Sequence, residues 1–270
     1  MIRDITIGQY YPTDSILHRL DPRVKFIATI VFIVSLFIDN TWTGYLVSTV
    51  FLAAVIKVSR VPFRFMVKGL KAVVILLLIT LFFNMIFTPG TPLFHVWIIT
   101  ITEEGVVLAV RMGIRLIYLI IGSSLMTLTT TPNQLTDGLE SLLKPLEKVK
   151  VPVHEISMMM SIALRFIPIL LEETDKIMKA QIARGADFES GGLMKKIRSM
   201  VPLLVPLFIS AFRRANDLAL AMEARCYHGG DGRTQMKPLR YRSRDWRAYL
   251  IMTAYLAVCI LIRIFGGYLI

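Results

Sequence analysis

The sequence has little of what most enzymes and metal sites need. It contains two cysteines and four scattered histidines in 270 residues. Cys226 and Cys259 lie far apart, in neither a zinc-binding spacing nor a disulfide framework. The chain also lacks a Walker phosphate loop, a His-Glu-x-x-His motif and a recognisable Ser/His/Asp grouping. We therefore expect no catalytic residue, no metal site and no cofactor.

Acidic residues are scarce beside basic ones: 19 Asp and Glu against 31 Lys and Arg make the net charge +12. Such an excess is typical of chains that bind nucleic acid or a membrane surface. Here 55% of the residues are hydrophobic, the mean hydropathy is +0.62, and the basic residues flank apolar runs. This pattern favours a membrane protein with no nucleic-acid partner, and it predicts an all-α, polytopic fold.

Five apolar runs are expected to cross the bilayer as helices: residues 24–38, 42–56, 70–87, 105–128 and 248–265. Asp21 as N-cap and Pro22 at the first helical position predict the start of the first helix. The first run has no small-residue cleavage site, so we expect it to remain as a membrane anchor. Residues 93–104 hold no Lys or Arg and are expected outside the cell.

The chain is expected to have four parts. They are an N-terminal membrane part at 1–130 with about four spans, a cytoplasmic coupling domain of three helices at 131–227, a basic loop at 228–247, and the last transmembrane helix at 248–266. Thr131 and Gln134 form a capping box that predicts the start of the first, short helix of the coupling domain.

The distribution of Lys and Arg predicts the orientation. With the N-terminus in the cytoplasm, all but Arg111, Arg115 and Arg263 of the 31 basic residues lie in cytoplasmic segments or at their edges, and the C-terminus is outside. Two further apolar stretches, 156–171 and 200–212, would place six basic residues outside if both spanned. We expect them in a helical domain below the membrane, and how deeply they sink into it stays open.

Two long helices, predicted at 153–184 and 193–225, carry the same pattern of apolar and small residues. The steps run 4-3-4-3-4-3 in each, and one constant offset superposes the two sets, bringing Ile156 onto Ile197. Such spacing predicts a narrow seam along each helix. The seam residues are Ile156, Met160, Ala163, Ile167, Leu170, Thr174 and Ile177 in the first helix, and Ile197, Val201, Leu204, Phe208, Ala211, Ala215 and Leu218 in the second.

Each seam leads to an arginine between small residues at the end of its helix. The two motifs are Ala183-Arg184-Gly185 and Ala224-Arg225-Cys226. Glycines follow both, as expected where helices stop. One interpretation is that two packed helices each hold an arginine out for a partner. The other is that both are ordinary C-terminal cations, which the helix dipole favours.

Arg111 and Arg115 lie four residues apart on one face of the fourth predicted span. Charges inside a membrane helix usually have a function. The alternative is that they lie near the outer interface and pair with Glu103 and Glu104. The residue pattern does not decide between these roles.

The N-terminal segment adds a further pattern: Gly8-Gln9-Tyr10-Tyr11-Pro12, then Ser15, then Leu20-Asp21-Pro22-Arg23. With this segment and the two small-Arg-small motifs between the fourth and last spans, the whole chain resembles the transmembrane T component (EcfT, CbiQ-like) of energy-coupling factor (ECF) transporters, the vitamin and metal uptake branch of ABC systems. Cys226 departs from the pattern, because another small residue is more usual there.

The resemblance implies a multi-pass subunit of the bacterial cytoplasmic membrane that is not itself an enzyme. It implies that Arg184 and Arg225 dock into grooves on two ATP-hydrolysing ABC-type subunits. It also implies that the coupling domain carries their motion to a separate substrate-binding membrane subunit, the S component. That subunit would bind the vitamin or metal, so this chain does not identify the substrate.

Two other classes of function stay open on the residues alone. A self-sufficient secondary carrier favours paired half-repeats with helices broken at mid-membrane, whereas the Pro-containing helices here occur in the basic region. A polytopic membrane enzyme needs clustered His, Asp or Glu within the membrane, and the apolar runs lack such clusters.

Overall fold

The computed structural model describes residues 10–39, 41–96, 99–186, 188, 192–230 and 236–266. Contacts within the chain divide it into two compact units. We call Gly8–Gly138 with Leu239–Ile270 the membrane unit, and Leu139–Pro238 the helix-pair unit.

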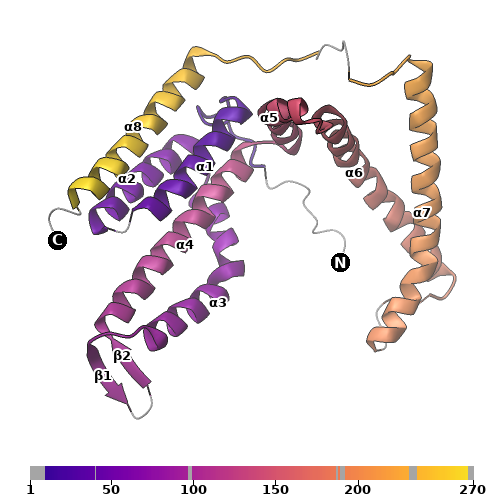
Figure 1. The fold of residues 1–270 in the computed structure, drawn as a ribbon. Coiled ribbons are helices and arrows are strands. Elements are labelled where there is room, and N and C mark those ends of the chain that lie inside the picture. The colour runs from indigo at the N-terminus through magenta and orange to yellow at the C-terminus, as the bar shows by residue number, and fades with distance from the viewer. Residues whose placement is uncertain are drawn as a thin grey trace. The chain divides into compact units, whose positions relative to one another are not determined.

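Among the described residues, five long helices form the membrane unit, and they correspond to the five predicted spans (Figure 1). They are α1 (Pro22–Ile38), α2 (Trp42–Ser59), α3 (Phe63–Phe87), α4 (Glu103–Thr129) and α8 (Ser243–Gly266). Asp21 caps α1 as predicted, because its carboxylate accepts the backbone N–H of Arg23 at 2.9 Å. α3 begins at Phe63 and α8 at Ser243, each before the apolar run that predicted it.

Four helices in the described part of the chain are long and apolar enough to cross a membrane: Trp42–Ser59, Glu103–Thr129, Val153–Ala183 and Ser243–Phe265. α3 contributes a shorter apolar segment, Val73–Phe87. Val153–Ala183 belongs to a long helix that the charge pattern predicts to lie below the membrane.

α1 and α8 run side by side in the same direction. At their starts, the backbone N–H of Asp21 donates to Asp245 at 3.0 Å. At their ends, the Arg263 guanidinium donates to the carbonyl of Ile38 at 2.9 Å. The last long helix of the chain therefore lies against the first, although the two come from opposite ends of the sequence.

α4 runs opposite to α1, because Lys25 near the start of α1 donates to the carbonyl of Thr129 at the end of α4, at 2.7 Å. The segment between α4 and α8 therefore leaves and returns at the same end of the membrane unit. It follows that the two long helices in this segment either both cross the membrane or both stay on one side.

Aromatic and aliphatic side chains form the core of the membrane unit. The rings of Phe51 and Tyr255 stack with their centroids 4.1 Å apart. The Tyr255 hydroxyl lies 2.9 Å from the hydroxyls of Ser35 and Ser48, so this polar group has partners inside the core. The buried core residues are Phe32, Leu36, Leu52, Val61, Met66, Ile121, Leu125, Leu128, Met252, Tyr255 and Cys259.

A short β-hairpin between α3 and α4 was not predicted. β1 (Pro92–Val96) and β2 (Ile99–Thr102) pair antiparallel and lie at the far tip of these two helices (Figure 1). Strands of four or five residues are too short for periodicity to distinguish them from a piece of helix. Apart from this hairpin the described part of the fold is all-α, as predicted.

Between α4 and α8 lie α5 (Pro132–Leu143), a 3-10 helix (Lys144–Val149), α6 (Val153–Ala183) and α7 (Leu193–Ala224). The predicted capping box starts α5: Gln134 N–H donates to the Thr131 hydroxyl at 3.3 Å, and Thr131 N–H donates to the Gln134 side chain at 3.2 Å. The observed bounds of α6 and α7 match the predicted helices at 153–184 and 193–225 to within one residue.

Candidate functional site

α6 ends at an arginine followed by a left-handed glycine. Arg184 is the C-cap residue, and Gly185 has φ +84°. Gly185 N–H donates to the carbonyl of Ile182 and Ala186 N–H to the carbonyl of Gln181, both at 2.9 Å. These two bonds are those of a Schellman motif, which satisfies carbonyls that the helix leaves unpaired. The arginine is therefore presented by a defined helix end.

α7 ends in the same way. Arg225 is the C-cap residue, and Cys226 has φ +55°. Cys226 N–H donates to the carbonyl of Glu223 at 2.9 Å, and Tyr227 N–H to the carbonyl of Met222 at 3.1 Å. The offset that relates the two seams also relates each of these residues to its counterpart at the end of α6. The repeat predicted from the sequence therefore extends to the backbone hydrogen bonds.

Both arginines are available to a partner as far as the described residues show. Arg184 and Arg225 are exposed, and neither forms an ion pair with a described residue. Their small neighbours are exposed as well: Ala183, Gly185, Ala224 and Cys226. A narrow groove could therefore admit each guanidinium without a clash with bulky flanking side chains.

α6 and α7 pack against each other as an antiparallel pair. Near the end of α6, Gln181 donates to the carbonyl of Pro202 at 3.3 Å. Closer to the middle, Glu173 pairs with Arg214 at 3.4 Å. As the contacts step back along α6 from Gln181 to Glu173, their partners step forward along α7 from Pro202 to Arg214. Figure 1 shows the two helices crossing. The prediction of two packed helices is confirmed.

A polar cluster holds the start of α6. His154 Nδ1 lies 2.9 Å from one carboxylate oxygen of Glu140 on α5, and the Ser157 hydroxyl donates to the other oxygen at 2.8 Å. Gly230, beyond the end of α7, lies so close that an added Cβ would be 2.5 Å from the His154 ring. The segment after Arg225 thus returns to the start of α6, and the two capping arginines lie at opposite ends of the pair.

The predicted seams are only partly buried within this chain. Ile156, Met160, Ala163 and Ile167 are exposed on α6, and Val201, Leu204 and Phe208 are 50–66% exposed on α7. Other seam residues are half-buried: Leu170, Thr174, Ile177, Ala211 and Leu218. Ala215 is exposed, and the side chain of Ile197 lies outside the described part. The contact between α6 and α7 leaves much of each seam uncovered, so its role as a coupling seam stays a prediction.

Comparison with known proteins identifies the family. The family described as cobalt transport protein, CbiQ, matches residues 13–236. A protein of Clostridium kluyveri named energy-coupling factor transporter transmembrane protein EcfT is 56% identical over 269 residues, 99% of this chain and 100% of the relative. A Bacillus subtilis protein of the same name is 45% identical over 264 residues, 97% of this chain and 100% of the relative. The chain belongs to the CbiQ/EcfT family.

As an EcfT-family protein, the chain is a multi-pass membrane protein and the transmembrane component of an ECF transporter. Its relatives are named as transporter subunits and not as enzymes. Among the described residues there is no group of three or more His, Cys, Asp or Glu that could hold a metal ion.

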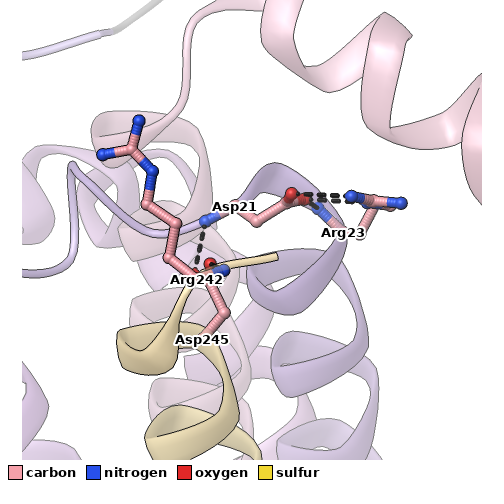
Figure 2. Close-up of polar contacts among 4 residues, drawn as sticks. All are labelled: Asp21, Arg23, Arg242 and Asp245. Atoms are coloured by element: carbon pink, nitrogen blue, oxygen red, sulfur yellow. Dashed lines mark hydrogen bonds and ion pairs between the residues drawn. The ribbon is translucent and has the colours of Figure 1, made fainter. Parts of the chain in front are cut away.

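The Leu20-Asp21-Pro22-Arg23 segment of this EcfT-family chain has a structural role. Asp21 accepts two hydrogen bonds from the Arg23 guanidinium, at 2.9 and 3.0 Å, while its own N–H donates to Asp245 (Figure 2). Asp245 also accepts the backbone N–H of Arg242 at 2.7 Å, which caps the start of α8. One segment therefore caps α1 and ties it to α8.

The preceding residues close the end of α4. Tyr11 N–H donates to the carbonyl of Leu128 at 2.9 Å, and the buried Lys25 ammonium donates to the carbonyls of Thr129 at 2.7 Å and His18 at 3.3 Å. A cation at a helix C-terminus is favoured by the helix dipole. The N-terminal segment thus joins α1 to α4 as well as to α8.

His18 lies at the centre of this segment. Its Nδ1 lies 2.7 Å from the Ser15 hydroxyl, and its Nε2 lies 3.1 Å from the carbonyl of Tyr11. Burial lowers the pKa of His18 below its ordinary value, and the hydrogen bond to the Tyr11 carbonyl opposes that shift. Gly8 and Gln9 lie outside the described residues.

Arg111 on α4 lies beside an aromatic ring. Its guanidinium is 5.5 Å from the centre of the Trp42 ring and forms no ion pair with a described residue. Glu104 instead accepts the backbone N–H of Thr91 at 2.8 Å. Arg115 is buried and lies within 3.8 Å of the sulfur of Met112. Among the described residues, Arg111 and Glu104 form no ion pair, so the alternative in which these two residues pair finds no support.

Proposed function

We propose that this chain transmits the motion of two separate ABC-type ATPase subunits to a separate substrate-binding membrane subunit, the S component. Arg184 and Arg225 would each dock into a groove on one ATPase subunit. The observation that carries this proposal is the equivalence of the two helix ends: the same C-cap, the same left-handed residue position and the same backbone hydrogen bonds, at opposite ends of one helix pair.

The chemistry of arginine suits this role. A guanidinium is planar, always charged, and forms forked hydrogen bonds to carboxylates. Each arginine is the C-cap residue of its helix. A force that a partner exerts on the side chain is therefore transmitted to the helix, with no loop in between. The antiparallel contact between Glu173 and Arg214 would then pass the motion from one helix to the other.

The exposed part of the seams supplies a surface for the S component. Val201, Leu204 and Phe208 lie on one stripe of α7 and remain at least half exposed in the chain alone. Apolar surface of this extent usually marks a contact with protein or lipid. In the proposed function the seam residues of both helices contact the S component, which binds the substrate.

The chain by itself would hydrolyse no ATP, since that activity belongs to the partner subunits. We also propose that it lies in the bacterial cytoplasmic membrane with the N-terminus inside and the C-terminus outside. The support is the charge pattern, in which Arg111, Arg115 and Arg263 alone among 31 basic residues fall outside the predicted cytoplasmic segments and their edges.

The test uses alanine and lysine at both arginines. Arg184→Ala and Arg225→Ala should leave the chain folded but weaken co-purification of the ATPase subunits, or uncouple hydrolysis from uptake. A desolvated arginine partner is worth about 2–5 kcal/mol, roughly thirtyfold or more in affinity. Lysine should rescue poorly, because it keeps the charge and loses the fork.

Arg213→Ala is the matched control, since Arg213 is exposed on α7 away from the helix end. It should assemble and transport normally. If Arg184 and Arg225 were ordinary helix-end cations, each would be worth about 0.3–1 kcal/mol and lysine would replace it nearly fully. Normal assembly and uptake by the double alanine variant would refute the docking of both arginines.

A further inference from the structure

Four arginines lie close together at the start of α8, and we call them the α8 arginine cluster: Arg240, Arg242, Arg244 and Arg247. Arg240, Arg242 and Arg247 are exposed, and Arg244 is half-buried. None of the four forms an ion pair with a described residue. So dense a group of like charges is unfavourable unless anions lie close to it.

Two acidic side chains at the starts of α8 and α1, Asp245 and Asp21, already have partners. Asp245 is buried, and its two oxygens accept the backbone N–H groups of Asp21 and Arg242. Asp21 is bound by two nitrogens of the Arg23 guanidinium (Figure 2). Figure 2 also shows the Arg242 guanidinium extending away from both carboxylates. Neither carboxylate therefore neutralises the Arg242 guanidinium.

Aromatic side chains accompany the cluster. The rings of Tyr241, Trp246 and Tyr249 form a triangle with centroids 6.2–6.5 Å apart, and Trp246 is 68% exposed. Tryptophan and tyrosine concentrate at the level of the lipid headgroups, where one edge of the ring is wet and the rest is apolar. An exposed Trp246 is therefore consistent with a position at the bilayer surface.

The length of α8 supports this position. The helix has 24 residues, about 36 Å at a rise of 1.5 Å each, and the hydrocarbon core of a bilayer is about 30 Å thick. Its apolar part begins at Ala248, after Arg247, so the first turn projects beyond the hydrocarbon. The arginines then lie at the depth of the phosphate groups of the lipids.

We propose that the α8 arginine cluster and Trp246 form a binding site for the phosphate headgroup of an anionic phospholipid. The guanidinium groups match phosphate oxygens in charge and geometry, and a run of basic residues beside a membrane helix attracts anionic lipids. The site rests on the membrane unit alone and does not depend on how Arg184 and Arg225 act.

The test measures which lipid lies beside Trp246. In the full chain, Trp42→Phe and Trp97→Phe leave Trp246 as the single tryptophan. The chain is reconstituted in phosphatidylcholine bilayers with a small fraction of dibrominated phosphatidylglycerol or dibrominated phosphatidylcholine, since bromine quenches tryptophan on contact. The dibrominated phosphatidylglycerol should quench Trp246 at a mole fraction at least about fivefold lower than dibrominated phosphatidylcholine does. This is the effect expected of one basic residue near an anionic surface.

Glutamine at all four positions of the cluster should abolish this preference. The fold should survive, because the bond that caps α8 uses the backbone N–H of Arg242 and not its guanidinium. The control removes the same number of charges from four exposed lysines of the helix-pair unit, and it should keep the preference. These lysines are Lys148, Lys150, Lys176 and Lys179.

Three results would overturn the proposal. One is equal quenching by the two brominated lipids in the single-tryptophan chain, and another is a preference that persists in the four-glutamine variant. The third is competition by another ligand: the preference is lost on adding inorganic phosphate at constant ionic strength, or on adding the partner ATPase subunits. Phosphate would reveal a site for a free anion, and the subunits a protein interface.

Discussion

Gly185 and Cys226 occupy the same position in two helix ends, each directly after a capping arginine and each with a positive φ, +84° and +55°. Glycine adopts this conformation freely, whereas a residue with a Cβ pays a steric cost of about 1 kcal/mol or more. The end of α7 is therefore the more strained of two otherwise equivalent ends.

Cys226→Gly should raise the free energy of unfolding by about 1 kcal/mol, because it removes the strain at the left-handed position. Gly185→Ala should lower it by a similar amount for the opposite reason. Thermal unfolding of the detergent-purified chain measures both. If Cys226→Gly did not stabilise the chain, Cys226 would not be strained at this position.

Gly230→Ala should destabilise the chain by about 1–3 kcal/mol, as overpacking does. The new Cβ would lie 2.5 Å from the His154 ring and would displace it from Glu140. Gly192→Ala is the control, since no atom lies within 4 Å of a Cβ there. In a double variant with His154→Ala, Gly230→Ala should cost much less than it does in the otherwise unchanged chain. Additive effects would contradict the contact.

Asp245→Ala should weaken the link between α1 and α8. It leaves the N–H groups of Asp21 and Arg242 without their acceptor, and each such loss costs about 1–3 kcal/mol. Asp245→Asn keeps one acceptor oxygen and should cost less. Asp14→Asn is the control, because Asp14 is exposed and forms a surface pair with Arg19. Thermal unfolding that ranked Asp14→Asn with Asp245→Ala would refute this role.

Cysteine labelling in intact cells tests the orientation. In a chain with Cys226→Ser and Cys259→Ala, we expect Met194→Cys and Met236→Cys to react only after the inner face is opened. Both methionines are strongly exposed, at 80% and 93%. Pro89→Cys, in the loop after α3, should react from outside. External labelling of Met194→Cys would contradict a cytoplasmic position for the helix pair.

Much of the fold could be predicted because its signals are local. Asp21 and Thr131 cap their helices through bonds that reach only to the next turn of the chain. The ends at Arg184 and Arg225 follow from small residues and glycines nearby, and the constant offset between the two motifs is a property of the sequence. The hairpin between α3 and α4 was missed because its strands are short.

The candidate site was only partly predictable. The sequence identifies the two arginines, but not the positive φ of Cys226, because cysteine is not typical of that conformation. His154 was missed because its partners, Glu140 and Gly230, lie in other elements, before α6 and after α7. The exposure of the seams was equally out of reach, because a heptad pattern says nothing about how much of a stripe its neighbour covers.

The sequence by itself determined which segments are helices, where they are capped, and that two equivalent arginines end the longest pair. Hydrophobic periodicity, caps and helix stops act within a few residues, so the chain carries them wherever it is placed. Only the tertiary structure decided that Asp21 meets Asp245, that Lys25 closes α4, and that Arg184 and Arg225 lie at opposite ends of the pair. Such contacts depend on which helices pack together, and packing joins residues that no local pattern connects.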